Sequence, residues 1–495
     1  MTSVLRALYR KFQSIWPWNK TLVEADADTV WKRSNDTARR NIAYKLVNIR
    51  GNGELQRIYR NDGADALREH IRWALPKYLY HDGRKVGVIT RMEFARYRHR
   101  LSKKGQSKTC RVCDQDSDWV NVTVCDECGQ PFHVNCLNPI LSKVPDDLWF
   151  CSVCKEDPEN LEHTDSLLEE KLNHDETVVD LKDHPACWNL KMRGVVGETP
   201  LHICYLSSTD DDKAIAKIML EEFPYLVHDI YEGTTFFGEN VLHFAIVKRD
   251  MESAKLLLQH GVSLVARGRG TFFQPSDIQN GSCTKGKTNF KGNACYGEYP
   301  LAFAASLGLI KMYDYFIKQS KKKPHLGEVN PNAQDSFGNT VLHWCVIHKQ
   351  KKMYKHALRH PVLAANQYIT NDAGLTPLAL ACRLGHCDMF TAIVDYSSKP
   401  LWTHGVTCLA CPLDILDSID TEGVKNESSA LRIIVKGSKE GHFKMLESSV
   451  VARLLDEKWR RYIKKRFMIK FAWILFTSRC CLLLHNSDQS IQTIY

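Results

Sequence analysis

The chain has 495 residues, of which 44% are hydrophobic and 25% are charged, and its formal net charge is +10. This length predicts about three domains, and the composition excludes both a wholly disordered chain and a polytopic membrane protein. Residues 1–20 interleave Arg6, Arg10 and Lys11 with apolar positions, so the apolar run of a secretion signal is not expected there. The chain is therefore expected to start in a reducing compartment.

The N-terminal region, residues 1–108, is basic, with 24 Lys and Arg against 10 Asp and Glu. Such a charge suits nucleic acid or anionic lipid, or it marks a solvated helical surface. Aromatic residues do not interleave with the charges as they do in nucleic-acid-binding patterns, so direct DNA binding is not expected. Apolar spacing predicts helices over Val4–Trp18 and Ala64–Leu75, and Pro76 ends the second.

Residues 109–157 carry eight soft metal ligands. These form four pairs, namely Cys110 with Cys113, Cys125 with Cys128, His133 with Cys136, and Cys151 with Cys154. Two thiolates separated by two residues reach one ion from a single tight turn, and eight ligands fill two tetrahedral zinc sites. The pattern therefore predicts two zinc ions. A set of disulfides is the alternative, which the expected reducing compartment disfavours.

The order of four Cys, one His and three Cys resembles a PHD finger, and Phe132 and Trp149 stand at the expected places beside the ligands. The resemblance implies a cross-braced arrangement. One zinc ion would lie on Cys110, Cys113, His133 and Cys136, and the other on Cys125, Cys128, Cys151 and Cys154. PHD fingers often bind histone tails, some through an aromatic cage around trimethyl-lysine. Pro131 stands where such readers tend to carry Trp. The finger is therefore expected either to bind an unmodified tail or to have a structural or protein-contact role.

An acidic linker is predicted at 158–180, and residues 181–397 are predicted to form ankyrin repeats. Five segments share an opening such as Gly197-Glu-Thr-Pro-Leu-His202, and they begin at Gly197, Gly238, Gly297, Gly338 and Gly374. A β-turn followed by two antiparallel helices is typical of this pattern. The spacings of 41, 59, 41 and 36 residues exceed the usual ~33 and predict long finger loops. The His residues of these openings (202, 243 and 343) are expected to tie adjacent turns together rather than to bind metal.

Residues 398–453 are predicted to be a strand-containing linker region, with short strands between Leu401 and Leu416. Residues 454–495 are predicted to be a basic helix and a truncated first transmembrane segment. The apolar run Phe471–Phe476 has six residues, whereas a spanning helix needs about 20. We therefore expect that the chain as given does not conduct ions by itself. The predicted fold class is mainly α: an ankyrin-repeat solenoid, a small zinc-stabilised PHD finger, and a C-terminal helical linker into an incomplete transmembrane helix.

The stretch from Leu181 to Phe476 resembles the cytosolic part of vanilloid-type transient receptor potential (TRPV) cation channels. The resemblance is carried by Gly197–His202, Gly268–Phe273, Gly297–Leu301 and Leu454–Phe476. It implies the ankyrin portion of a calcium-permeable channel subunit that assembles with other channel subunits on the cytoplasmic side of a membrane. The basic segment 459–470 would then contact anionic lipid. A PHD finger is not a usual part of these channels, so a truncated or fused gene product is a further interpretation.

Two other functions stay open at this point. The chain is a candidate nuclear chromatin adaptor, in which the finger reads a histone tail and the repeats bind a partner. A zinc-dependent enzyme such as a ubiquitin ligase is the third hypothesis, although a RING-like ligase orders its ligands differently. Nucleophile–base pairs, phosphate loops and paired catalytic carboxylates are not evident in the sequence. We therefore expect no enzymatic activity, no catalytic residues and no cofactor besides zinc.

Overall fold

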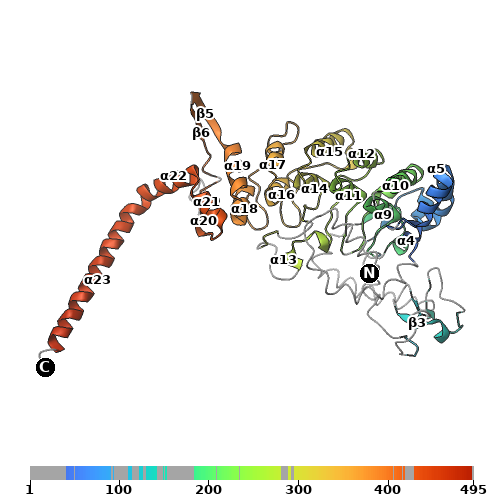
Figure 1. The fold of residues 1–495 in the computed structure, drawn as a ribbon, viewed down its shortest axis with the longest axis horizontal. Coiled ribbons are helices and arrows are strands. Elements are labelled where there is room, and N and C mark those ends of the chain that lie inside the picture. Colours follow the sequence, from blue (N-terminus) through green and yellow to red (C-terminus); the bar gives the residue numbers. More distant parts are fainter. Residues whose placement is uncertain are drawn as a thin grey trace.

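The computed structural model describes residues 41–49, 51–90, 93, 110–113, 122–125, 130–141, 149, 151–152, 183–194, 196–207, 209–233, 235–279, 288–290, 295–404, 406–414, 416–417 and 428–492. Its main body is a row of helix pairs, which confirms the predicted mainly helical solenoid (Figure 1). The helix expected over Val4–Trp18 and the acidic linker at 158–180 lie outside the described residues.

Each pair contributes one helix to an inner row and one to an outer row (Figure 1). The inner row contains α4 (Ile42–Leu46), α9 (Pro200–Ser207), α11 (Val241–Val247), α14 (Pro300–Ser306), α16 (Val341–Ile347), α18 (Pro377–Leu384) and α20 (Ala430–Lys436). The outer row contains α5 (Glu54–Ala74), α10 (Asp210–Glu222), α12 (Met251–Gln259), α15 (Ile310–Lys322), α17 (Lys351–Leu358), α19 (Cys387–Ser397) and α21 (Glu440–Leu446). Successive inner helices pack against one another, so the buried side chains form one continuous core from Ala43 to Val451.

The shared openings form the turns that enter the inner helices. The glycine at each opening has a positive φ, for example 86° at Gly197 and 84° at Gly238. A Cβ at Gly197 would lie 2.2 Å from the backbone nitrogen of Gly233, and a Cβ at Gly238 would lie 1.9 Å from the carbonyl oxygen of Arg267. Only glycine fits both the backbone conformation and the close approach of the next turn. These turns therefore set the spacing between neighbouring repeats.

The solenoid begins well before the expected start at residue 181. Helices α4 and α5 pack against α9 and α10, and their buried residues belong to the same core as the repeats. The end of α5 at Ala74, before Pro76, agrees with the predicted end of a helix at this point. Part of the basic N-terminal charge forms ion pairs between α5 and α10. Arg60 pairs with Asp211 at 2.7 Å, and Arg72 pairs with Glu222 at 2.6 Å. The first pair was missed as a repeat because it lacks the shared opening.

The cysteine-rich segment is inserted between the first and second helix pairs. Strand β1 (Gly87–Ile89) pairs antiparallel with β4 (His184–Ala186), so that Ile89 lies opposite His184. The pairing continues toward the solenoid, where the Tyr80 N–H donates to the Cys187 carbonyl at 2.8 Å. The chain thus leaves and re-enters the solenoid at one place, and residues 90–183 are inserted between these two paired strands.

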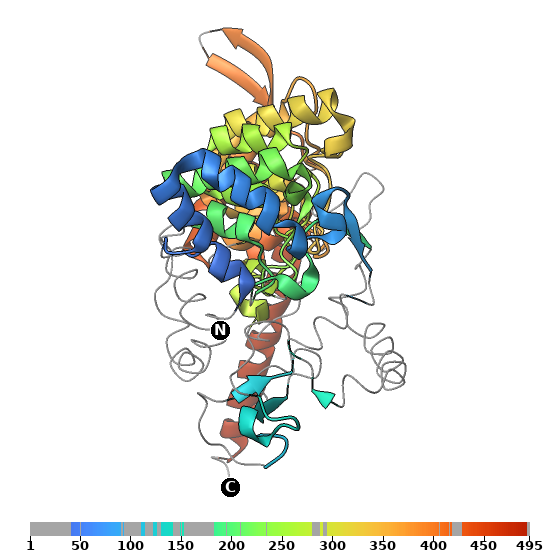
Figure 2. The same ribbon diagram turned by 90° about the vertical axis from the view of Figure 1, so that its right-hand side faces the viewer.

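Between α19 and α20 the chain forms a hairpin, and after α21 it continues into a long helix. Strands β5 (Lys399–His404) and β6 (Val406–Ala410) pair antiparallel, within the predicted strand region. Helix α22 (Ser449–Lys458) continues through the π-helical turn η10 (Trp459–Ile463) into α23 (Lys464–Gln492). Figure 2 shows α23 running toward the side of the molecule opposite the outer helices. Among the described residues, none of the helices combines the length and apolar character needed to cross a bilayer.

Single helical turns connect the larger elements. They are η1 (Pro76–Tyr78), η2 (Tyr80–Gly83), η5 (Leu190–Met192), η6 (Pro224–His228), η7 (Thr271–Phe273), α13 (Ser276–Gln279) and η9 (Pro324–Leu326).

Candidate metal centre

Three short elements bring the first predicted ligand set together. Cys110 and Cys113 lie in one turn, and this turn is tied to the start of strand β3 by the Arg111 N–H, which donates to the Pro131 carbonyl at 2.9 Å. Strand β2 (Val122–Val124) pairs with β3 (Pro131–His133), and His133 ends β3. The turn η4 (Val134–Cys136) follows directly and carries Cys136 back toward His133. Each pair of ligands, separated by two residues, thus comes from one of two facing segments of the chain.

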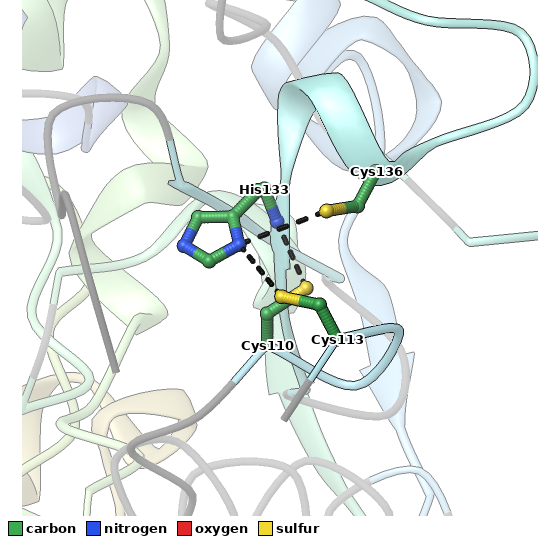
Figure 3. Close-up of side chains that lie close together, drawn as sticks. All are labelled: Cys110, Cys113, His133 and Cys136. Atoms are coloured by element: carbon green, nitrogen blue, oxygen red, sulfur yellow. Dashed lines mark hydrogen bonds between the residues drawn. The ribbon is translucent and has the colours of Figure 1, made fainter. Parts of the chain in front are cut away.

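The four side chains converge on one point (Figure 3). The Nδ1 atom of His133 lies 3.3 Å from the Cys113 sulfur and 3.8 Å from the Cys136 sulfur. The Cys110 sulfur accepts the backbone N–H of His133 at 3.3 Å and that of Val112 at 3.5 Å. One donor atom from each residue lies within 4.8 Å of all the others.

This geometry and chemistry fit zinc. Ligand atoms about 2.3 Å from a tetrahedral ion are roughly 3.7 Å apart, which is close to the spacing found here. Burial raises the pKa of the Cys110 thiol, but N–H donors, above all that of His133, bring it down to about 6. Burial and the neighbouring Cys113 raise the pKa of Cys136 to about 11. Three thiolates this close repel one another, so a divalent cation is needed to hold them ionised together.

Half of the second predicted set is described. The backbone N–H of Cys151 donates to the Cys125 sulfur at 3.3 Å, and both residues are buried. They form a small core with Phe132, against which the Trp149 ring packs edge-on at 5.5 Å between centroids. Cys128 and Cys154 lie outside the described residues, so the second zinc ion stays a prediction.

Two of the three histidines of the repeat openings, His243 and His343, have the expected structural role. His202 is also buried, but its Nε2 atom has no hydrogen-bond partner among the described residues, so it does not tie adjacent turns together. His243 and His343 are buried, and each ring contacts the cap residue three positions earlier, Asn240 or Thr340. The Nε2 atom of His343 lies 2.9 Å from the Leu375 carbonyl in the next turn. Burial lowers the pKa of each ring to about 4, which keeps both neutral. They act as cross-links between repeats.

A further cluster, which the sequence analysis did not identify, lies between α15 and α17. An oxygen of Asp314 lies 2.5 Å from Nε2 of His356 and 3.3 Å from Nε2 of His360. The Nδ1 atom of His360 accepts the N–H groups of Val362 and Leu363 at 3.3 and 3.1 Å. The neutral ring therefore carries its proton on Nε2, where a metal ion would need an electron pair. The cluster is a hydrogen-bonded contact between Asp314 of α15 and two histidines in and just after α17. In the sequence, only the spacing of four positions between His356 and His360 indicates that the two rings can lie close together.

Two exposed apolar surfaces lie at the C-terminal end of the solenoid. On the β5–β6 hairpin, Leu401, Trp402 and Leu409 are 65%, 56% and 53% exposed. On α23, a run from Phe467 to Phe476 presents exposed aromatic and aliphatic side chains. In the preceding basic turns, Arg460 and Arg461 pair with Asp456 and Glu457 one turn earlier. Both surfaces offer area for contact with another molecule.

Comparison with known proteins agrees with both parts of this description. A family model described as "PHD-finger" matches residues 110–154, and one described as "Ankyrin repeats (3 copies)" matches residues 301–401. The first match contains all eight predicted ligands. The second begins in α14 and ends in β5.

The chain is also similar to cation channel subunits. It is 29% identical over 310 residues to transient receptor potential cation channel subfamily V member 5 of Rattus norvegicus, which covers 60% of this chain and 39% of the relative. Subfamily V member 6 of Homo sapiens is 30% identical over 329 residues, which covers 64% of this chain and 39% of the relative. The chain thus spans about two fifths of the length of these curated relatives. It combines a PHD-type finger with an ankyrin-repeat region similar to that of TRPV channels.

Proposed function

We propose that this chain is a TRPV-like ankyrin-repeat portion of a calcium-permeable cation channel subunit that carries a zinc-binding PHD finger. Its role is assembly with channel subunits at the cytoplasmic side of a membrane. Residues 1–495 do not conduct ions alone and catalyse no reaction in this proposal. The observation that carries it is the exposed apolar hairpin β5–β6, which directly follows α19 in a solenoid similar in sequence to these channels.

The exposed apolar side chains of the β5–β6 hairpin favour contact with another protein. Large apolar side chains that stand exposed on a strand pair favour burial against a partner, and ~25 cal/mol is gained for each Å² of apolar surface removed from water. Ankyrin repeats generally mediate contacts between proteins, and the finger loops of neighbouring subunits are the expected partners of this hairpin. These contacts require no pore.

Co-expression with a full-length relative, human subfamily V member 6, tests the proposal. We expect the tagged chain to co-purify with that channel and to alter its current. The double variant Leu401→Ser/Trp402→Ser should lose association, whereas Trp73→Ser, which removes a side chain that is 78% exposed on α5, should keep it. Association that is indifferent to the hairpin variant would contradict the proposed contact, and robust current from the chain alone would contradict the assembly role.

The finger is proposed to hold two zinc ions. The first would be bound by Cys110, Cys113, His133 and Cys136, and the second by Cys125, Cys128, Cys151 and Cys154. A closed set of protein ligands gives zinc a structural role and leaves no position for a reactive water. The ions would supply folding energy that so small a core lacks.

The PHD-finger match also supports a second candidate, a nuclear chromatin adaptor, because PHD fingers bind histone tails. Pro131 is buried in β3 opposite Val124, so it provides no aromatic wall for a trimethyl-lysine cage. We therefore expect calorimetry with the full chain to show no preference for a trimethylated over an unmodified tail peptide. A clear preference for the methylated peptide, together with nuclear localisation of the tagged chain, would favour the adaptor over the channel role.

A further inference from the structure

The outer helices α15 and α17 form a basic surface in the middle of the solenoid. It contains nine lysines and one arginine, namely Lys311, Lys318, Lys321, Lys322, Lys323, Lys349, Lys351, Lys352, Lys355 and Arg359. Asp314 is the only acidic residue from 310 to 323 and from 349 to 359. The two helices are neighbours, because Asp314 contacts His356 and the Lys321 ammonium donates to the Val362 carbonyl at 3.4 Å. We call this set of ten residues the convex basic patch.

Most of this charge is not compensated within the described part of the chain. Lys351 lies 3.6 Å from Asp388, and Asp314 is already engaged by its two histidines. Lys311, Lys318, Lys322, Lys349 and Lys352 are exposed and have no carboxylate within 4.0 Å among the described residues. By contrast, arginines and acids pair closely between α5 and α10 at the N-terminal end of the same row. A local excess of like charge raises the positive potential at this one place and attracts an anionic partner.

The side-chain composition of the patch and its position on the molecule restrict the chemical class of its partner. Its charges are almost all lysine ammonium groups, which act as point charges, whereas bidentate recognition of phosphate favours arginine. Large apolar side chains that would insert into a bilayer are not exposed on α15 or α17. Both views also place these helices on the side away from the far end of α23 (Figures 1 and 2), so one flat bilayer does not reach both. Carboxylates spread along a polypeptide suit such a surface best.

We propose that the convex basic patch docks an extended acidic polypeptide segment of a partner protein. Helix α15 has 13 residues, which corresponds to a length of about 20 Å at 1.5 Å per residue. An extended peptide covers that length with roughly six residues. A glutamate-rich segment of about six residues therefore spans the length of α15 and reaches the shorter α17, which has 8 residues and lies beside it. A peptide of about twelve residues contains such a segment with residues to spare at its ends.

Fluorescence anisotropy with the full chain and a labelled peptide of about twelve residues, alternating Glu and Ser, tests this proposal. The double variant Lys318→Glu/Lys352→Glu should weaken binding about tenfold or more, and Lys318→Arg/Lys352→Arg should preserve it. Raising the salt from about 50 mM to about 300 mM should also weaken binding, because exposed charges are screened. Melting curves of each variant verify that the solenoid stays folded.

The matched control is Lys217→Glu/Lys436→Glu, which changes the net charge equally at exposed helix positions on α10 and α20, outside the patch. Equal weakening by both double variants would overturn the proposal, because net charge alone would then explain binding. No binding of the peptide would overturn it as well. Tighter, patch-dependent binding to phosphatidylserine vesicles or to a DNA duplex would also overturn it, in favour of a bilayer or nucleic-acid surface.

Discussion

At the scale of single residues, the same turn position has three different environments in successive repeats. Glu198 is buried and contacts the Tyr44 hydroxyl and the Val196 N–H, while Glu298 pairs with Arg267 and accepts the Ser336 N–H at 3.0 Å. Glu239 is buried and neither of its carboxyl oxygens has a hydrogen-bond partner among the described residues. Burial raises the pKa of Glu239 well above its ordinary value. Identical residues in identical turns therefore contribute differently to stability.

We expect Glu239→Gln to stabilise the chain at alkaline pH. In the unfolded chain this carboxyl ionises near its ordinary pKa, but in the folded chain it stays protonated to higher pH. The free energy of unfolding of the parent therefore falls as pH rises between these two pKa values. Urea unfolding should show the variant more stable by on the order of 1 kcal/mol at about pH 8, with little difference near pH 4.5.

The control for this prediction is Glu298→Gln, which should destabilise the chain at both pH values because it breaks the contact with Arg267. If Glu239→Gln were as destabilising as this control at alkaline pH, Glu239 would have a partner that stabilises its charge.

At the scale of elements, the inner helices are held by their mutual packing rather than by their own length. Helix α11 has seven residues, which is too short to be stable alone in water, and all seven are buried between neighbouring inner helices. A repeat buries its apolar face only against its neighbours, so one damaged interface weakens both sides.

Val241→Asp should therefore be severely destabilising. Val241 is fully buried at the start of α11, so the substitution places an unpaired carboxylate in the core and should lower the free energy of unfolding by more than about 3 kcal/mol. Thermal melting of the full chain measures it. Val362→Asp, at a position that is 50% exposed, is the matched control and should melt like the parent. Equal melting of both variants would show that the repeat interface is placed wrongly.

The finger is an element of another kind, since the core formed by its described residues contains only Cys125, Phe132 and Cys151. Elemental analysis of the purified chain should find two zinc ions, and Cys125→Ala should release zinc and unfold the finger, because three ligands no longer balance the ion. Cys387→Ala, which changes a cysteine on α19, should retain the full zinc content. One ion or none in the parent chain would refute the two-site prediction.

At the scale of the whole molecule, the architecture is a continuous solenoid with an insertion. The finger interrupts the chain between the first two helix pairs without interrupting the core, because β1 and β4 bring the two ends of the loop together. Two structural parts thereby share one scaffold. One is the metal-binding module inserted between β1 and β4, and the other is the solenoid with its outer helices, hairpin and C-terminal helix.

Replacing residues 90–183 with Asn-Gly should leave the solenoid folded. Ile89 and His184 are opposite each other, so a two-residue turn is the natural connection between them. We expect the melting temperature to stay within about 3 °C of the parent, since none of the described residues of the deleted segment belongs to the solenoid core. Zinc content should fall to zero. A collapse of the solenoid on deletion would mean that the finger packs against it and is part of its stability.

Features that depend on local spacing could be predicted from the residues alone. Ligand pairs separated by two residues predicted the cluster of Cys110, Cys113, His133 and Cys136, because one turn suffices to aim two ligands at one ion. The repeated openings predicted the turns, because only glycine adopts the required backbone conformation where the next turn approaches so closely. The His residue at a fixed place in the opening predicted the buried cross-link to the next turn.

Features that depend on contacts between distant residues could be recognised only once the chain was folded. Helices α4 and α5 belong to the solenoid because of what they pack against, although their sequence lacks the shared opening. The finger is an insertion because Ile89 pairs with His184, which lies far along the chain. The convex basic patch likewise exists only because α15 and α17 stack side by side. This packing brings their lysines close enough for the positive electrostatic potentials of the two helices to add.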